Sequence, residues 1–273
     1  MNNFKTFLLL SFVLPTALLL AQTTKEHTFH NSFAPFLREG DRPLLNFTLH
    51  NKQQVDWTGT ASFSLQDGDA KQSVDGWFMN SIANQYFTVD ANSLYLLLFP
   101  IEVPFFYNQL LNWKLAIESS QDSMIAQGIL PILSWPYEDS VNTPIFAQPF
   151  VAIEKKIYAS DAIQRGQKVL IEISFELSKK IDNLLLVDEW AAGLVPEKGA
   201  IQINGTLNKY FLESKTFRSR TVKFTQLSPG KYTLRYHAVG TYPGVYNQPP
   251  TQLFLNGATS YGARSSYQRI TIE

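Results

Sequence analysis

The sequence predicts an all-β protein made of two antiparallel sandwiches of the immunoglobulin or fibronectin type. Apolar and polar residues alternate with a period of two in many short segments, and turn residues separate these segments. No segment has a helical period long enough for a helix, and aromatic residues, which favour β-structure, make up 14% of the chain. Strands are predicted, in chain order, at residues 45–49, 55–65, 87–89, 94–101, 113–117, 129–133, 151–158, 169–177, 184–187, 222–224, 232–239 and 267–272.

In the first half, residues 55–65 alternate without a break up to Asp67-Gly68, a hairpin signal. Residues 94–101 form a continuous apolar run that is short enough for a fully buried strand. In the second half, Val169 to Leu177 place apolar residues on one face and Glu172, Ser174 and Glu176 on the other. Pro229-Gly230 is a turn, after which residues 232–239 alternate again. These patterns indicate sheets with one buried face.

Residues 1–21 are predicted to be a secretory signal peptide. Lys5 gives a positive start, and the apolar run from Thr6 to Leu20 is shorter than the roughly 20 residues that span a bilayer. Cleavage is expected near Ala21 and would leave no membrane span; an uncleaved N-terminal anchor is the alternative. Three prolines and little periodicity mark residues 134–149 as a linker. The expected domains are therefore 22–133 and 150–273.

Charge and cysteine content exclude several classes of function. Lys and Arg number 23 and so do Asp and Glu, so no electrostatic argument favours a nucleic acid. The chain has no cysteine, which excludes disulfides and a thiolate nucleophile. With the signal peptide, this composition suggests a bacterial protein that is periplasmic or secreted.

No constellation of residues predicts catalysis, a cofactor or a metal site. His27 and His30 follow the predicted cleavage point without a helical pattern, so we expect a disordered polar lead rather than a metal site. His237 is expected on a solvated strand face, and Asp67-Gly68-Asp69 in a hairpin turn. We therefore expect a protein that is not an enzyme.

Two groups of motifs carry a resemblance to bacterial alpha-2-macroglobulins. The first half contains Pro35-Phe-Leu-Arg-Glu-Gly-Asp41, Phe99-Pro-Ile-Glu-Val-Pro104 and Leu130-Pro-Ile-Leu133. The second half contains the order Pro229-Gly230, Tyr232, Tyr236, Ala238, Gly244, Tyr246, Pro249-Pro250 and Arg264-Ser265, which resembles the end of the last domain of that family. Asp188 to Glu197 resembles a further family motif, with Trp190-Ala191 in place of Leu-Pro. The resemblance implies two macroglobulin-like domains without the thioester domain.

The resemblance implies an exported protein-interaction module whose partner is a protein of the envelope or the extracellular space. One alternative is a non-covalent protease inhibitor, or a subunit that completes a larger macroglobulin; another is a carbohydrate-binding or adhesion module. Covalent trapping is excluded, because the family's thioester needs a cysteine. Partner-binding residues are expected in the turn-rich segments 241–250 and 256–266, where tyrosine and arginine favour strong contacts; they are Tyr242, Tyr246, Tyr261 and Arg264. The alternative is that Tyr246 and Pro249-Pro250 brace the edge of the sandwich and bind no partner.

Overall fold

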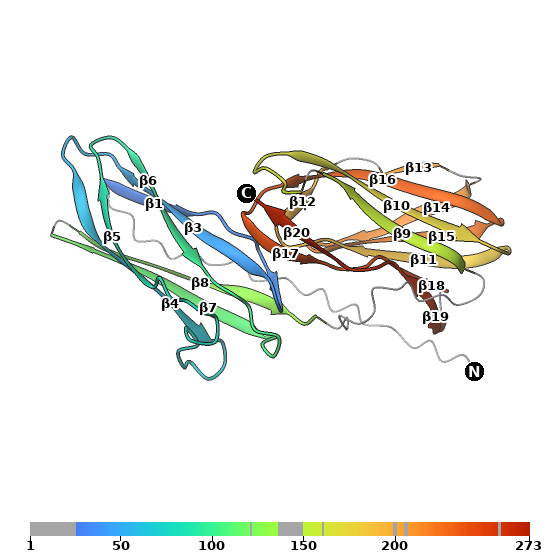
Figure 1. The fold of residues 1–273 in the computed structure, drawn as a ribbon, viewed down its shortest axis with the longest axis horizontal. Coiled ribbons are helices and arrows are strands. Elements are labelled where there is room, and N and C mark those ends of the chain that lie inside the picture. The colour runs from blue at the N-terminus through green and yellow to red at the C-terminus, as the bar shows by residue number, and fades with distance from the viewer. Residues whose placement is uncertain are drawn as a thin grey trace, which may run out of the picture.

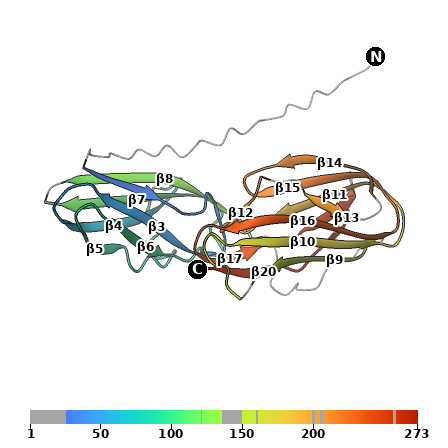
Figure 2. The ribbon, with the colours of Figure 1, turned by 90° about the horizontal axis from the view of Figure 1, so that it is seen from above.

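The computed structural model describes residues 26–120, 122–135, 150–159, 161–198, 201–204, 207–255 and 258–273. These residues form two β-sandwich lobes that lie end to end in an elongated molecule (Figures 1 and 2). Strands β1 to β8 build the N-terminal lobe, and β9 to β20 build most of the C-terminal lobe. The described residues contain no helix, so the predicted all-β fold is confirmed.

Two sheets face each other in the N-terminal lobe. β3 lies between β1 and β6 in one sheet, and the other sheet has the order β2-β8-β7-β4-β5. All these pairs are antiparallel except β2 with β8. The strands are β1 (His27–Asn31), β2 (Leu37–Arg38), β3 (Arg42–Asn51), β4 (Trp57–Asp67), β5 (Asn84–Val89), β6 (Leu94–Pro100), β7 (Leu110–Ser119) and β8 (Ser123–Leu133).

The C-terminal lobe is a second antiparallel sandwich. One sheet has the order β12-β16-β10-β9, with β13 also paired to β16, and the other has the order β14-β15-β11-β18-β19. Its strands are β9 (Phe150–Tyr158), β10 (Lys168–Leu177), β11 (Ile181–Glu189), β12 (Leu194–Pro196), β13 (Gln202–Asn204), β14 (Leu207–Lys215), β15 (Ser219–Leu227), β16 (Gly230–Gly240), β18 (Gln252–Leu255) and β19 (Ala258–Arg264).

Two strands from the C-terminal half of the sequence extend a sheet of the N-terminal lobe. β17 (Gly244–Gln248) pairs with β20 (Gln268–Ile272) and also with the start of β3, which gives the order β1-β3-β17-β20. Figure 1 shows this meeting point between the two lobes. One hydrogen-bonded sheet thus crosses from lobe to lobe.

The period-two alternation of the sequence is visible in the burial of the strands. In β10, Val169, Ile171, Ile173, Phe175 and Leu177 are buried, as the alternation predicts. The strand predicted at residues 94–101 is present as β6, but the expectation that it is fully buried is wrong. β6 is an edge strand that pairs only with β3, so Leu94 and Leu96 are exposed.

His27 contradicts the expectation of a disordered polar lead. It begins β1 and is fully buried, with its ring stacked on Trp57 at a centroid distance of 4.1 Å. Its Nδ1 lies 2.5 Å from Oδ2 of Asp122. The local sequence is polar, but pairing of β1 with β3 places His27 over the core.

The predicted signal peptide (1–21) lies outside the described residues, as does the predicted linker except for Ser134 and Trp135. Within the described part of the chain, no helix is long and apolar enough to cross a membrane.

Candidate functional site

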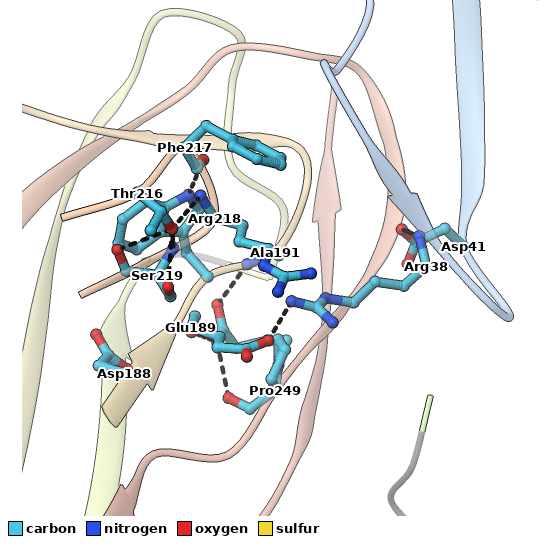
Figure 3. A network of polar contacts seen from close by, with 12 residues as sticks. Arg38, Asp41, Asp188, Glu189, Ala191, Thr216, Phe217, Arg218, Ser219 and Pro249 are labelled. Atoms are coloured by element: carbon cyan, nitrogen blue, oxygen red, sulfur yellow. Dashed lines mark hydrogen bonds and ion pairs between the residues drawn. The ribbon is translucent and has the colours of Figure 1, made fainter. Parts of the chain in front are cut away.

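A group of polar contacts between segments far apart in the sequence lies where the two lobes meet. We call this site the joint and define it by Arg38, Glu39 and Asp41 of the N-terminal lobe and by Glu189 and Asn247. Figure 3 shows the Arg38 side chain extending toward Glu189, with Asp41 beside the Arg38 backbone. These contacts connect the two sandwiches directly.

Backbone pairing forms the base of the joint. Gly244 and Val245 of β17 pair with Pro43 and Arg42 of β3. The backbone N–H of Leu44 donates to the carbonyl oxygen of Pro243 at 3.0 Å. Gly244 has a φ of 142°, and a Cβ atom there would lie 2.7 Å from the carbonyl oxygen of Arg42. Glycine is therefore required for this close approach of the two strands.

Asp41 is the buried carboxylate of the joint. It accepts the backbone N–H of Arg38 through Oδ2 and that of Asn247 through Oδ1, each at 2.8 Å. Burial raises the pKa of Asp41 to about 7, although these hydrogen bonds and the charges of Arg38 and Arg269 act in the opposite direction. The carboxylate thus joins a turn of one lobe to a strand of the other.

The neighbouring residues close the joint around Asp41. The side-chain amide of Asn247 donates through Nδ2 to the carbonyl oxygen of Glu39 at 2.9 Å. Oε2 of Glu39 accepts the backbone N–H of Trp135 at 2.6 Å. Gly40 lies between Glu39 and Asp41 in the sequence and has a φ of 79°. A Cβ atom at this position would collide with the ring of Phe105 and the side-chain amide of Asn247. The turn therefore fits against β17 only with glycine at this position.

An ion pair links the lobes beside the carboxylate. Nη2 of Arg38 donates to Oε2 of Glu189, and the Arg38 side chain is almost fully buried. Nε2 of Gln248 donates to the carbonyl oxygen of Glu189 at 2.8 Å, and the backbone N–H of Ala191 donates to Oε1 of Gln248 at 3.0 Å. These contacts hold the end of β11 against β17.

A second polar cluster lies inside the C-terminal lobe, around Asp188, the residue that precedes Glu189. Nζ of Lys155 donates to Oδ1 of Asp188 at 2.6 Å and to the carbonyl oxygen of Glu189 at 2.7 Å. The hydroxyls of Tyr236 and Thr251 also donate to the Asp188 carboxylate, at 2.5 and 2.8 Å. Burial raises the pKa of Tyr236 well above its ordinary value. The sequence indicated none of these pairings.

The predicted partner-binding residues do not form one exposed site. Tyr246 is buried, with 1% of its surface exposed, and its hydroxyl donates to the carbonyl oxygen of Pro243 at 2.9 Å. The expectation that Tyr246 is accessible is wrong, because β17 turns its ring into the protein. Tyr242 and Arg264 are half-buried, and Tyr242 packs against the core. The side chain of Tyr261 lies outside the described residues.

An exposed group of apolar side chains borders the joint and was not anticipated from the sequence. We call it the apolar loop surface and define it by Trp77, Met79, Phe105 and Phe106. The rings of Trp77 and Phe106 meet edge to face, with centroids 5.6 Å apart, which brings two separate loops together. Phe105 connects this surface to the joint, because its ring lies against Gly40.

Within the described part of the chain, no group of three His, Asp or Glu side chains could hold a metal ion. The joint contains carboxylates, amides and a guanidinium that are bound to one another. These polar groups thus satisfy one another across the boundary between the lobes.

Residues 150–255 match the family model described as the bacterial alpha-2-macroglobulin MG10 domain. This range includes Pro229 to Pro250, so the resemblance predicted from that segment is confirmed. A search of curated proteins found no match to the chain.

Several solved structures are similar to the chain at low identity. Escherichia coli alpha-2-macroglobulin from domain MG7 to its C-terminus is 17% identical, with a TM-score of 0.40 over 80% of this chain and 33% of that one. A Salmonella alpha-2-macroglobulin mutant is 18% identical, with a TM-score of 0.40 over 79% of this chain and 13% of that one. Red sea bream transglutaminase is 10% identical, with a TM-score of 0.30 over 92% and 32%. The chain thus spans about a third or less of each of these proteins.

Proposed function

We propose that the chain is an exported, non-enzymatic protein-interaction module, because residues 150–255 match the bacterial alpha-2-macroglobulin MG10 domain model. Its partner is a protein of the periplasm or the extracellular space. In this proposal the joint holds the two sandwiches in one orientation, and the apolar loop surface contacts the partner.

The apolar loop surface is the observation that carries this proposal. Phe106 is 70% exposed and Trp77 is 55% exposed, and their rings contact each other. Large aromatic side chains in contact with water favour burial against a partner, and aromatic residues often dominate the energy of protein interfaces. The outward-facing residues of β4 and β7 are mostly polar, whereas single apolar side chains are exposed on other strands, among them Leu94 and Leu96 of β6.

The loops that carry this surface are anchored on both sides. Phe78, between Trp77 and Met79, is fully buried and packs edge to face on Tyr107 with centroids 4.9 Å apart. The backbone N–H of Glu102 donates to the carbonyl oxygen of Phe78 at 2.9 Å. Since the loops are already ordered, a partner loses less free energy in fixing them.

One double variant and one control variant test this function. Trp77→Ala with Phe106→Ala removes the two contacting rings, and Tyr86→Ala removes a still more exposed aromatic ring on β5, outside the surface. Each purified protein is crosslinked to the envelope fraction of the source cells, and the captured proteins are identified by mass spectrometry.

We expect the wild type and Tyr86→Ala to capture the same partner, and the double variant to lose it by tenfold or more. Equal capture by all three proteins would overturn the assignment of the surface. Capture of glycans without any protein would instead support a carbohydrate-binding module.

A further inference from the structure

Lys155 and Asp188 meet in the interior of the C-terminal lobe from opposite sheets. Lys155 lies on β9 and Asp188 on β11, and these strands belong to different sheets of the sandwich. Their side chains are each 1% exposed, and Nζ of Lys155 lies 2.6 Å from Oδ1 of Asp188. An amine and a carboxyl group are thus held in contact in a site from which water is excluded.

The surroundings favour the neutral form of the amine. Burial lowers the pKa of Lys155, and the nearby charge of Arg38 acts in the same direction, whereas Asp188 and Glu189 oppose it. In a medium of low dielectric constant, a charged pair gains stability when a proton passes from the ammonium to the carboxylate. An unprotonated amine is a nucleophile, and a protonated carboxyl group is an electrophile.

Both oxygens of the carboxyl group are held by hydroxyl donors. The Tyr236 hydroxyl donates to Oδ2 at 2.5 Å, and the Thr251 hydroxyl donates to Oδ1 at 2.8 Å. Donors at these oxygens stabilise the negative charge that develops when a nucleophile adds to the carbon. Arg220, the cross-strand neighbour of Asp188, stacks its guanidinium over the Tyr236 ring at 4.6 Å and places a positive charge beside the group.

We propose that Lys155 and Asp188 form a site of intramolecular amide formation, which crosslinks the two sheets of the C-terminal lobe. A proton first passes from Nζ to the carboxylate. The amine nitrogen then attacks Cγ of Asp188, a second proton leaves the nitrogen, and the carboxyl hydroxyl departs with it as water. One C–N bond forms and one C–O bond breaks, so an ammonium and a carboxylate give one amide and one water, without an oxidant or a further reactant.

The position of the crosslink suits a protein that cannot form disulfides. The chain has no cysteine, so no sulfur bond can join its sheets. An amide between β9 and β11 would close a loop from residue 155 to residue 188 and restrict the unfolded chain, as a disulfide does. It would also fix the position of β11, the strand that carries Glu189 of the joint.

The mass of the intact, purified protein, whose N-terminus is determined first, tests the proposal directly. We expect the protein to be lighter by one water molecule than its sequence mass, calculated from that N-terminus to Glu273, and tandem mass spectrometry of a digest to find the peptide of Lys155 joined to that of Asp188. A mass equal to the sequence mass, with two unjoined peptides, would overturn the proposal and leave the pair as a buried ion pair.

Three variants identify the roles of the residues. Lys155→Arg should keep the full sequence mass, and Asp188→Asn should lose ammonia instead of water, because its amide is still an electrophile. Tyr236→Phe should slow the reaction, so that uncrosslinked protein accumulates. Should a variant not fold, the mass of the wild type still decides the question.

Discussion

The backbone N–H of Asn247 donates to the Asp41 carboxylate across the boundary between the two lobes, at 2.8 Å. The two residues are 206 positions apart, and the contact is buried. The same carboxylate accepts the N–H of Arg38, so one side chain joins a turn of the N-terminal lobe to β17. Replacing Asp41 would therefore remove two hydrogen bonds of the joint at once.

Asp41→Ala should destabilise the protein, because it leaves the buried N–H groups of Arg38 and Asn247 without an acceptor. Each of these two unsatisfied donors costs about 1–3 kcal/mol, so the free energy of unfolding should fall by about 2–6 kcal/mol. Denaturant unfolding measures this loss. Asp69→Ala, at an exposed turn position, is the control and should change stability by less than about 0.5 kcal/mol. Equal effects of the two substitutions would contradict the role of Asp41.

The stability of the joint should depend on pH through Asp41. Burial raises the pKa of this carboxyl from 3.8 to about 7. The folded protein therefore binds the proton more tightly than the unfolded chain does. This contribution is complete below the unfolded pKa and is lost as the pH rises through the folded pKa.

Lowering the pH from about 8.5 to about 5.5 should thus add about 2 kcal/mol to the free energy of unfolding. Asp41→Asn cannot titrate and should lose this gain. Urea unfolding of both proteins across this range checks the prediction, and parallel pH profiles would refute it.

The Arg38–Glu189 ion pair should add to the free energy of unfolding, because the two side chains interact across the boundary between the lobes. Removing Arg38 alone leaves Glu189 without its partner, and removing Glu189 alone leaves a buried guanidinium. Arg38→Met and Glu189→Gln should each lower the free energy of unfolding by about 1–3 kcal/mol. This loss is smaller than that expected for a fully buried ion pair, because Glu189 is partly exposed. The double variant should cost less than the sum. Additive losses in a double-mutant cycle would show that the pair is not coupled.

The sequence predicted strands well where burial follows local alternation. β10 and β16 lie where the alternating residues predicted them, since each strand has one face on the core. The joint could not be predicted in this way, because Asp41 and Asn247 carry no local sign of each other. The apolar loop surface was missed for a related reason: Trp77 is exposed and the adjacent Phe78 is buried, and no periodicity in that loop distinguishes them.

Tyr246 shows how a segment with turn residues can hide a strand. Gly244 and Pro249 mark breaks, but the residues between them pair with β20 and turn Tyr246 inward. Tyr246→Ala should therefore lower the free energy of unfolding by about 3–5 kcal/mol, as the loss of a large buried aromatic ring does. Tyr242→Ala, at a half-buried position, should cost clearly less. Thermal unfolding distinguishes the two, and a smaller loss for Tyr246→Ala would contradict its buried position.

The distance between spin labels on the two lobes tests most directly whether the joint fixes their orientation. Gln127 on β8 and Ala152 on β9 are exposed, and because the chain has no cysteine, Gln127→Cys and Ala152→Cys provide the only labelling sites. Electron paramagnetic resonance should give one narrow distance distribution in the otherwise wild-type chain and a broader one when Asp41→Ala is added. A broad distribution in the wild-type background, unchanged by Asp41→Ala, would contradict the claim that the two lobes form one rigid module.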